Sequence, residues 1–210
     1  MTLLTGIVPS VTPLQKLIFE GNSLMANSSA GINQWEYYLV KTVYASIRAS
    51  HEVTLLNFSI SGRNQTQIND SIATNITPNV REGDIIILWE GTNDMYTNGL
   101  SGAAAYANLV TYSETVRALG AQLVLCNVIA RDYELDAGDL MDRIDAYNAL
   151  CDANQAAICD AYVDLYAEPE FDTRADASDT DYYHTDKIHI VQGAYDIINP
   201  LITAAIETLL

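Results

Sequence analysis

Three side-chain types in this chain could together carry out nucleophilic attack on a carbonyl: a serine, a histidine and an aspartate. Ser23 follows an apolar run near the N-terminus, and His184 and His189 lie near the C-terminus. Each of these two histidines has an aspartate three positions earlier, Asp181 or Asp186. A serine hydroxyl becomes a good nucleophile once a histidine takes its proton, and a carboxylate behind the histidine holds the ring in the useful tautomer.

Of the three histidines, His189 is the strongest candidate for the base. His51 precedes a predicted strand and would lie at the amino end of the sheet. His184 lies within the acidic stretch 168–186, where a partly exposed polar residue is expected. His189 directly precedes the last predicted helix, whose packing would hold the ring in place. Asp186 is then the carboxylate that orients it.

A nucleophile of this kind also needs donors for the negative charge that develops on the carbonyl oxygen. Gly62 offers a backbone N–H that a substrate can approach, because glycine has no Cβ. Asn93 offers a side-chain NH₂. Each residue also has a plainer interpretation, Gly62 as a turn glycine and Asn93 as a helix or turn cap.

Five short apolar runs predict strands that are buried on both faces, because they are rich in Ile, Val and Leu without strict alternation. Helix-like stretches separate them, with Asn33 and Asp139 as expected N-caps and Gly120 as an expected helix stop. This alternation predicts one α/β domain over 1–210, with a parallel sheet and helices on both faces. The strands are predicted at 17–20, 53–58, 84–90, 122–128 and 161–165, and the helices at 33–49, 66–76, 103–119, 139–156 and 191–209, the last with a kink at Pro200.

This architecture determines where chemistry can occur. In open parallel sheets, ligands bind beyond the carboxyl ends of the strands. Ser23, Gly62 and Asn93 follow the first three predicted strands, and His189 follows the fifth. The sequence therefore predicts that these residues meet at one edge of the sheet.

Four sequence blocks, in this order, resemble those of the SGNH (GDSL-type) hydrolase family. They are Gly21-Asn22-Ser23, Gly62, Gly91-Thr92-Asn93-Asp94 and Asp186-xx-His189. The resemblance implies a flavodoxin-like, three-layer α/β/α fold with strand order 2-1-3-4-5. It also implies a triad of Ser23, His189 and Asp186, and an oxyanion hole from the N–H of Ser23, the N–H of Gly62 and the side chain of Asn93.

The resemblance covers nearly the whole chain, since Tyr147-Asn148 and Val163-Asp164 also fit the family's pattern. The first block departs from the pattern, because Asn22 stands where the family usually has Asp. The block around Gly62 is the loosest of the four. No Gly-x-Ser-x-Gly sequence is present, which argues against the sharp nucleophile elbow of α/β-hydrolases.

The charge of the chain excludes several classes of partner. Ten Lys and Arg against 27 Asp and Glu give a net charge of −17, and such a surface repels nucleic acids and anionic membranes. The N-terminus has no basic start, and Pro9 and Pro13 interrupt its apolar stretch, so no signal peptide is expected. These features fit a cytoplasmic protein, part of a larger assembly, or export by another route.

No cofactor or metal is expected. The sequence has no CxxC, HExxH, Walker loop or GxGxxG motif. Its three cysteines are odd in number, which predicts reduced, buried thiols rather than a disulfide framework.

The sequence thus predicts a serine esterase or acylhydrolase that works through an acyl-enzyme on short, acetyl-type esters, with a carbohydrate ester as the expected substrate. The alternatives are a lipase or thioesterase for longer acyl chains, and a non-catalytic carbohydrate- or partner-binding module on the same fold. A flavodoxin-like nucleotide binder is a further rival, but the segment after the first strand lacks phosphate-cradling glycines.

Two acidic residues stand at the ends of neighbouring predicted strands. Glu20 precedes Gly21, and Glu90 precedes Gly91. If the two glycines lie at the same level, the carboxylates share a face, and Arg63 is the nearest candidate cation. If the strands are staggered, each Glu instead accepts its own backbone N–H bonds.

Overall fold

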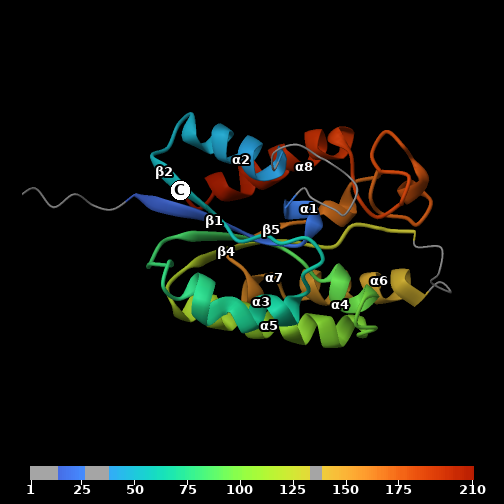
Figure 1. Cartoon of the computed structure of the whole chain (residues 1–210), viewed down its shortest axis with the longest axis horizontal. Coiled ribbons are helices and arrows are strands. Elements are labelled where there is room, and N and C mark those ends of the chain that lie inside the picture. Colours follow the sequence, from blue (N-terminus) through green and yellow to red (C-terminus); the bar gives the residue numbers. More distant parts are fainter. Residues whose placement is uncertain (1–13, 27–37, 133–138) are drawn as a thin grey trace, which may run out of the picture.

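The computed structural model describes residues 14–26, 38–132 and 139–210, and its centre is a five-stranded parallel sheet. The strand order is β2-β1-β3-β4-β5, which confirms the predicted doubly wound topology (Figure 1). The strands are β1 (Gln15–Gly21), β2 (Val53–Asn57), β3 (Ile85–Trp89), β4 (Gln122–Cys126) and β5 (Ala161–Val163).

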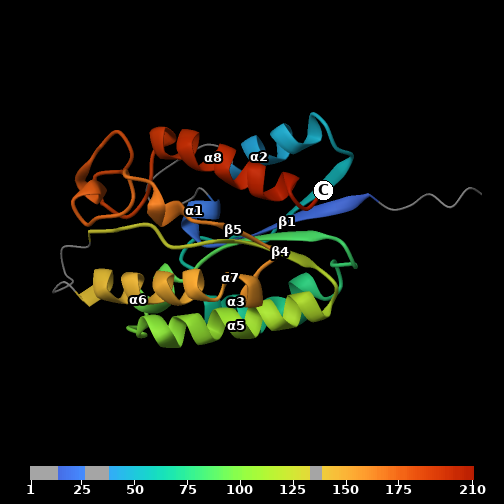
Figure 2. The same cartoon turned by 180° about the vertical axis from the view of Figure 1, so that it is seen from behind.

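Helices cover both faces of this sheet and complete the three layers, as Figures 1 and 2 show from opposite sides. One face carries α1 (Ser23–Ala26), α2 (Tyr38–Arg48) and α8 (Gln192–Glu207). The other face carries α3 (Gln65–Ser71), α4 (Thr92–Tyr96), α5 (Gly102–Ala118), α6 (Asp139–Ala153) and α7 (Gln155–Ile158).

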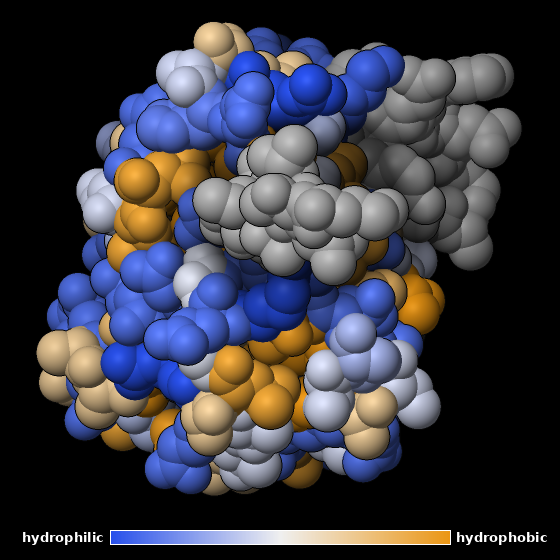
Figure 3. Space-filling view, turned by 90° about the vertical axis from the view of Figure 1, so that its left-hand side faces the viewer, coloured by the Kyte–Doolittle hydropathy of each residue, from blue (hydrophilic) through white to orange (hydrophobic). Residues whose placement is uncertain are grey.

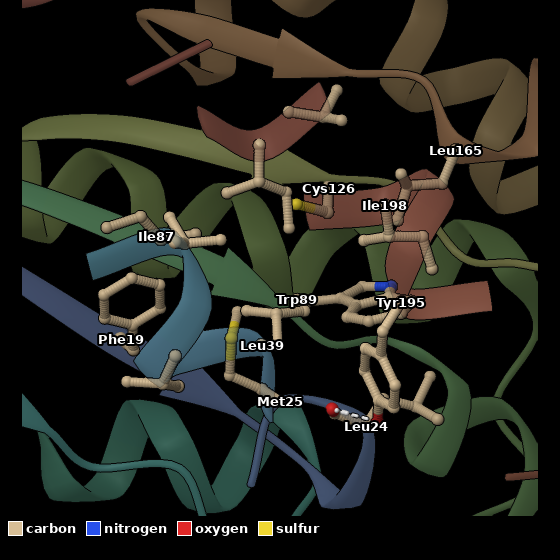
Figure 4. Packing of buried hydrophobic residues seen from close by; sticks show 14 of the residues in the cluster. Phe19, Leu24, Met25, Leu39, Ile87, Trp89, Cys126, Leu165, Tyr195 and Ile198 are labelled. Carbon is tan, nitrogen blue, oxygen red and sulfur yellow. Dashed lines mark hydrogen bonds between the residues drawn. The ribbon is translucent and has the colours of Figure 1, made fainter. Parts of the chain in front are cut away.

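Alternate strand residues face the two helical layers, so the protein has two hydrophobic cores. Phe19, Ile87 and Trp89 pack toward α2 and α8, whereas Ile86 and Leu88 pack toward α3, α5 and α6. Figure 4 shows the first of these cores close to the chain segment that carries Ser23. Successive strand residues point to opposite faces, and both faces are covered by helices. The strand sequences are therefore apolar without strict alternation.

The element boundaries differ from the predicted ones mainly at the carboxyl ends. β2, β3, β4 and β5 all stop one or two residues before the predicted last residue. The predicted second helix, 66–76, continues past α3 as a π-helical segment, Ile72–Ile76, and the predicted fourth, 139–156, is divided into α6 and α7. Gly120 follows α5 with a positive φ, as a helix stop does, and Asp139 is the first residue of α6. The predicted cap Asn33 lies outside the described residues.

Of the two arrangements left open for Glu20 and Glu90, the level alignment is wrong and the strands are staggered. In the register of β1 and β3, Glu20 pairs with Leu88 and Gly21 pairs with Trp89, so the glycines are offset by two residues. A two-residue offset keeps the same face but moves the carboxylates apart by roughly 7 Å along the strands. Arg63 therefore pairs with Glu20, whereas the positive charge of Arg131 acts against the effect of burial on the pKa of Glu90.

The amino ends of the strands form the face opposite the carboxyl-end loops. Figure 3 shows this face as hydrophilic side chains around small, separate hydrophobic groups. His51 lies here, between α2 and β2, as its place in the sequence predicts. Among the helices of the described residues, none has the length and apolar character that a membrane crossing requires.

Candidate active site

A continuous chain of hydrogen bonds joins Ser23, His189 and Asp186 at the carboxyl end of the sheet. The Oγ of Ser23 lies 2.9 Å from Nε2 of His189, and Nδ1 of the same ring lies 2.7 Å from Oδ2 of Asp186. Ser23 and His189 are 166 positions apart in the sequence. The structure thus brings together the three residues that the sequence singled out, in the order hydroxyl, imidazole, carboxylate.

Ser23 is held by the transition from β1 into α1. The Oδ1 of Asn22 accepts a hydrogen bond from the N–H of Leu24 at 2.9 Å, and its main-chain carbonyl accepts one from Ala26. Asn22 therefore caps this short helix through an oxygen that an Asp would also provide. From the other side, the hydroxyl of Tyr195 on α8 donates to the carbonyl of Leu24, the dashed line in Figure 4.

Asp186 and His189 lie on one tight turn that leads into α8. The Oδ1 of Asp186 accepts the backbone N–H groups of Ile188 and His189, at 3.0 and 2.9 Å. Lys187 between them has a φ of +59°, a left-handed conformation that is uncommon for residues other than glycine. The turn thereby directs one oxygen of Asp186 to the backbone and leaves the other for the imidazole.

The surroundings favour a neutral imidazole beside an ionised carboxylate. Burial lowers the pKa of His189 below 6.5, the bond to Asp186 opposes this, and the positive charge of Arg131 adds to the decrease. Burial alone would raise the pKa of Asp186, but its bonds from the backbone and ring of His189 and from Ile188 hold that pKa below its usual value. At neutral pH, Nε2 of His189 is thus free to accept a proton from Ser23.

Gly62 lies on the turn after β2, and Asn93 lies on the short helix α4 that follows β3. Asn93 donates one N–H of its amide to the carbonyl of Arg63 at 2.7 Å, which leaves the second N–H of that NH₂ group for another acceptor. Gly62 has a φ of +79°, and a Cβ added there would have no protein atom within 4 Å. The backbone conformation, rather than crowding inside the protein, is therefore the reason for glycine at this position.

Asp94 fixes the position of the segment that follows β3, which includes α4. This buried carboxylate accepts the backbone N–H of Gln65 at 2.5 Å and the amide of Asn108 at 3.2 Å, and so joins α4 to the start of α3. Gly91 opens the same segment with a φ of +120°, and its missing side chain leaves space for the ring of Tyr147. Sequence reasoning placed Asp94 within the third block but assigned it no role.

His184 takes no part in this chain of hydrogen bonds. Its backbone N–H donates to the carbonyl of His189 at 2.7 Å, while its Nδ1 lies 3.3 Å from the hydroxyl of Thr185. Within the described part of the chain, no hydrogen bond joins its ring to Asp181. The structure therefore distinguishes the two Asp-x-x-His pairs, because only the pair of Asp186 and His189 is hydrogen-bonded to Ser23.

Two further residues near the site were missed by sequence reasoning. Asp132, just beyond β4, accepts hydrogen bonds from Lys187 and Arg174 and thereby ties down the turn that carries His189. Arg131 beside it is buried. The only signal for both was their position after the fourth strand, on the predicted functional edge of the sheet.

Comparison with solved structures places this geometry in a known fold. TesA superposes with a TM-score of 0.72 at 17% identity, over 93% of this chain and 100% of the other. The esterase EstA from Pseudoalteromonas sp. gives 0.65 at 16% identity, over 92% and 97% of the two chains. Axe2, an acetyl-xylooligosaccharide esterase from Geobacillus, gives 0.65 at 13% identity, over 91% and 94%.

The sequence itself carries a family signature although no curated protein matches it. The profile of the GDSL-like Lipase/Acylhydrolase family matches residues 19–196, which span all five strands from within β1 and reach into α8. On that match the chain belongs to the GDSL-like Lipase/Acylhydrolase family of ester-hydrolysing enzymes.

Proposed function

We propose that this protein is a serine esterase in which Ser23 is the nucleophile, His189 the general base and Asp186 the residue that orients His189. The observation that carries the proposal is the unbroken set of hydrogen bonds from Ser23 Oγ through His189 to Asp186, at 2.9 and 2.7 Å. The first distance is within hydrogen-bond reach for proton transfer from the nucleophile to the base, and the second is short enough for the carboxylate to orient the imidazole.

In the first half of the reaction, Ser23 Oγ attacks the ester carbonyl carbon while its proton passes to Nε2 of His189. The tetrahedral intermediate then breaks its bond to the alcohol oxygen, and His189 returns the proton to that leaving group. In the second half, His189 takes a proton from water as the water attacks the acyl-enzyme. Collapse of the second intermediate releases the acid and restores the Ser23 hydroxyl.

The oxyanion that forms in both halves needs fixed donors. We assign this role to the N–H groups of Ser23 and Gly62 and to the second N–H of the Asn93 amide. Because Asn93 already gives one N–H to the carbonyl of Arg63, its amide plane is set before substrate arrives. Such preorganised donors are typically worth ~3–4 kcal/mol each in the transition state.

For the substrate, we propose a short acyl ester, above all an acetyl ester of a carbohydrate. A pocket of about 400 Å³ adjoins Gly62, and polar residues, including Ser61, Gln67 and Asn75, contribute about half of its lining surface. Hydroxyl-rich sugars suit such a lining better than a long acyl chain does. The net charge of −17 also disfavours polyanionic acyl carriers, and Axe2 offers a precedent for acetylated sugar substrates on this fold.

The test is hydrolysis of a series of p-nitrophenyl esters from acetate to octanoate, together with an acetylated xylooligosaccharide. We expect rates to fall steeply beyond roughly four acyl carbons. An enzyme with an acyl groove would show the opposite trend, because each CH₂ that it buries adds about 0.8 kcal/mol of binding free energy. Rates that rise toward octanoate would support the lipase or thioesterase alternative. No hydrolysis of any of these esters would favour a binding module.

The roles of the residues are tested by substitution. Ser23→Ala and His189→Ala should each lower kcat by a factor on the order of 10⁴–10⁶ while the protein stays folded. His184→Ala is the matched control, because its ring contacts Thr185 rather than Ser23. Full activity in purified Ser23→Ala enzyme, or an exchange of behaviour between the two histidine variants, would refute the assignment.

A further inference from the structure

Arg63 directly follows Gly62, and its guanidinium is buried rather than solvated. Its Nη1 donates to Oε1 of Glu20 at 3.3 Å and to the carbonyl of Phe58 at 3.0 Å. Its Nη2 donates to the carbonyl of Gln67 at 3.3 Å and to the hydroxyl of Ser71. One side chain therefore joins the end of β1, the start of the turn after β2, and α3.

Glu20 is a rigid anchor for this arginine. It is fully buried, and its second oxygen, Oε2, accepts the hydroxyl of Tyr112 at 2.5 Å. Burial raises the pKa of Glu20, while the bonds from Tyr112 and Arg63 oppose that rise. A buried carboxylate with both oxygens bonded has one orientation, so it also fixes the guanidinium opposite.

The main chain of Arg63 connects this anchor to the proposed oxyanion hole. Its carbonyl accepts the Asn93 amide at 2.7 Å, and its N–H donates to the carbonyl of Ile60 at 3.2 Å, across the turn that contains Gly62. The N–H of Ile60 donates in turn to the carbonyl of Gly21, two residues before Ser23. A shift of Arg63 would therefore move Gly62 and Asn93 together.

We propose that Arg63, held by Glu20, is a positioning residue that sets the geometry of the oxyanion hole by fixing the Gly62 turn and the Asn93 amide. The inference rests on the proposed esterase function and adds a residue that does not touch the reacting atoms. A displacement on the order of 1 Å in such donors is enough to cost about a hundredfold in rate.

Arginine is required here because of its shape as well as its charge. Four acceptors surround the guanidinium: Glu20, Phe58, Gln67 and Ser71. The ammonium of lysine has three donors on one atom and cannot reach acceptors placed around a planar fork. Arg63→Lys should therefore resemble Arg63→Ala in activity, although it keeps the positive charge.

The first experiment measures kcat and KM for p-nitrophenyl acetate in Arg63→Ala, Arg63→Lys and Glu20→Gln. We expect kcat to fall about tenfold to hundredfold in the Arg63 variants and less in Glu20→Gln, with KM within about threefold of wild type. The affinity for a small alkylboronic acid should fall in parallel with kcat/KM, because its tetrahedral adduct with Ser23 would place an oxygen in the oxyanion hole.

The second experiment is chemical rescue. The pocket beside Gly62 is open to solvent and Arg63 is part of its lining, so a small cation can reach the space left by Arg63→Ala. Methylguanidinium should restore part of the lost kcat, whereas methylammonium at the same concentration should not. A merely destabilised enzyme would respond equally to both ions.

Asp84→Asn is the matched control, since Asp84 is also a buried carboxylate in an ion pair, with Lys16, but at the amino end of β3. It should lower stability and leave kcat unchanged. If folded Arg63 and Glu20 variants keep wild-type kcat, or differ from wild type only in KM, the positioning role is wrong. If Ser23→Ala stays active and wild type does not bind the boronic acid, the proposed function itself has failed.

Discussion

The hydroxyl of Tyr195 donates a hydrogen bond of 2.9 Å to the main-chain carbonyl of Leu24, the residue after Ser23. Tyr195 lies on α8, three residues after the position at which that helix begins, and is itself almost fully buried. Because α8 directly follows the turn that carries His189, this bond connects the two halves of the proposed catalytic chain. Figure 4 shows the Tyr195 hydroxyl joined to Leu24 by the dashed line, among the residues of this core.

Tyr195→Phe should therefore reduce activity more than its small change in volume suggests. Loss of the hydroxyl leaves the carbonyl of Leu24 without this buried donor, at a cost of about 1–3 kcal/mol in unfolding free energy. It also loosens α1, so kcat should fall several-fold. The measurements are denaturant unfolding and steady-state hydrolysis of a p-nitrophenyl ester.

Tyr44→Phe provides the control for this prediction. The Tyr44 hydroxyl also donates to a main-chain carbonyl, that of Val53, at 3.3 Å, but at the start of β2, away from Ser23. This variant should keep wild-type kcat. Equal kcat in the two phenylalanine variants would show that the bond from Tyr195 does not position Ser23.

The pH dependence should reflect the lowered pKa of His189. Catalysis requires the neutral imidazole, so kcat/KM should decline as the pH falls through the pKa of His189 in the free enzyme. Since burial and the charge of Arg131 lower that pKa below 6.5, more than half of the maximal kcat/KM should remain at pH 6.5. The profile can be measured with a p-nitrophenyl ester at the isosbestic wavelength of the product. A half-maximal point above pH 6.5 would contradict the prediction.

Asp132 holds the turn that contains Asp186 and His189. Its Oδ2 accepts Nζ of Lys187 at 2.8 Å, its Oδ1 accepts Nε of Arg174, and its N–H donates to the carbonyl of Lys187. The bonds from Lys187 and Arg174 lower the pKa of Asp132. Its hold on the turn is therefore present at neutral pH and is lost as the pH falls through that lowered pKa.

Asp132→Asn should lower kcat several-fold and speed hydrogen exchange at the amide of His189. The charges involved are partly exposed, so high salt should weaken the wild-type contacts and narrow the difference between the two enzymes. The control is Asp139→Asn, which removes an ion pair with Arg143 on α6. The carboxylate of Asp139 is more exposed than that of Asp132, and this variant should leave kcat unchanged. Unchanged exchange at His189 in the Asp132 variant would argue against this role.

Sequence reasoning predicted the features that depend on periodicity and on short-range order. Buried parallel strands appear as uninterrupted apolar runs, and residues that directly follow such runs, among them Ser23 and Asn93, must lie on one edge of the sheet. The choice of His189 over His184 also followed from chain order, because only His189 is adjacent to the start of a long helix.

The remaining features depend on register and on loop paths that no local pattern encodes. Arg63 was anticipated as the cation near Glu20, and a stagger of the strands was left open. The size of that stagger, two residues, was not predicted, because the register of β1 and β3 is set by packing along the whole pair. Asp132 was missed because its partner Lys187 is 55 positions away and is brought close only by the folded turn.

Glu90 gives the last prediction, because it is a carboxylic acid in an almost fully buried position at the end of β3. Burial raises its pKa to about 8, although the N–H of Gly91, the amide of Asn22 and the charge of Arg131 each act in the opposite direction. In the unfolded chain the same group ionises near its ordinary pKa of 4.5. The folded protein therefore binds one more proton than the unfolded chain between these two values.

This difference in proton binding destabilises the fold as the pH rises. The contribution of Glu90 is greatest below about pH 4.5, declines by up to roughly 1.4 kcal/mol per pH unit, and levels off above about pH 8. Glu90→Gln removes this titration. The unfolding free energy of the variant minus that of wild type should therefore increase from pH 5 to pH 8, by an amount on the order of a few kcal/mol.

Urea unfolding of both proteins at several pH values between 5 and 9 measures that difference directly. Glu114→Gln, on an exposed position of α5, controls for the loss of one negative charge from a chain of net charge −17. Because only the change with pH is compared, any constant cost of the new amide, including its effect on Arg131, cancels. Parallel curves for wild type and Glu90→Gln would show that Glu90 is ionised in the folded protein at pH 5, and that the surrounding dipoles and Arg131 outweigh its burial.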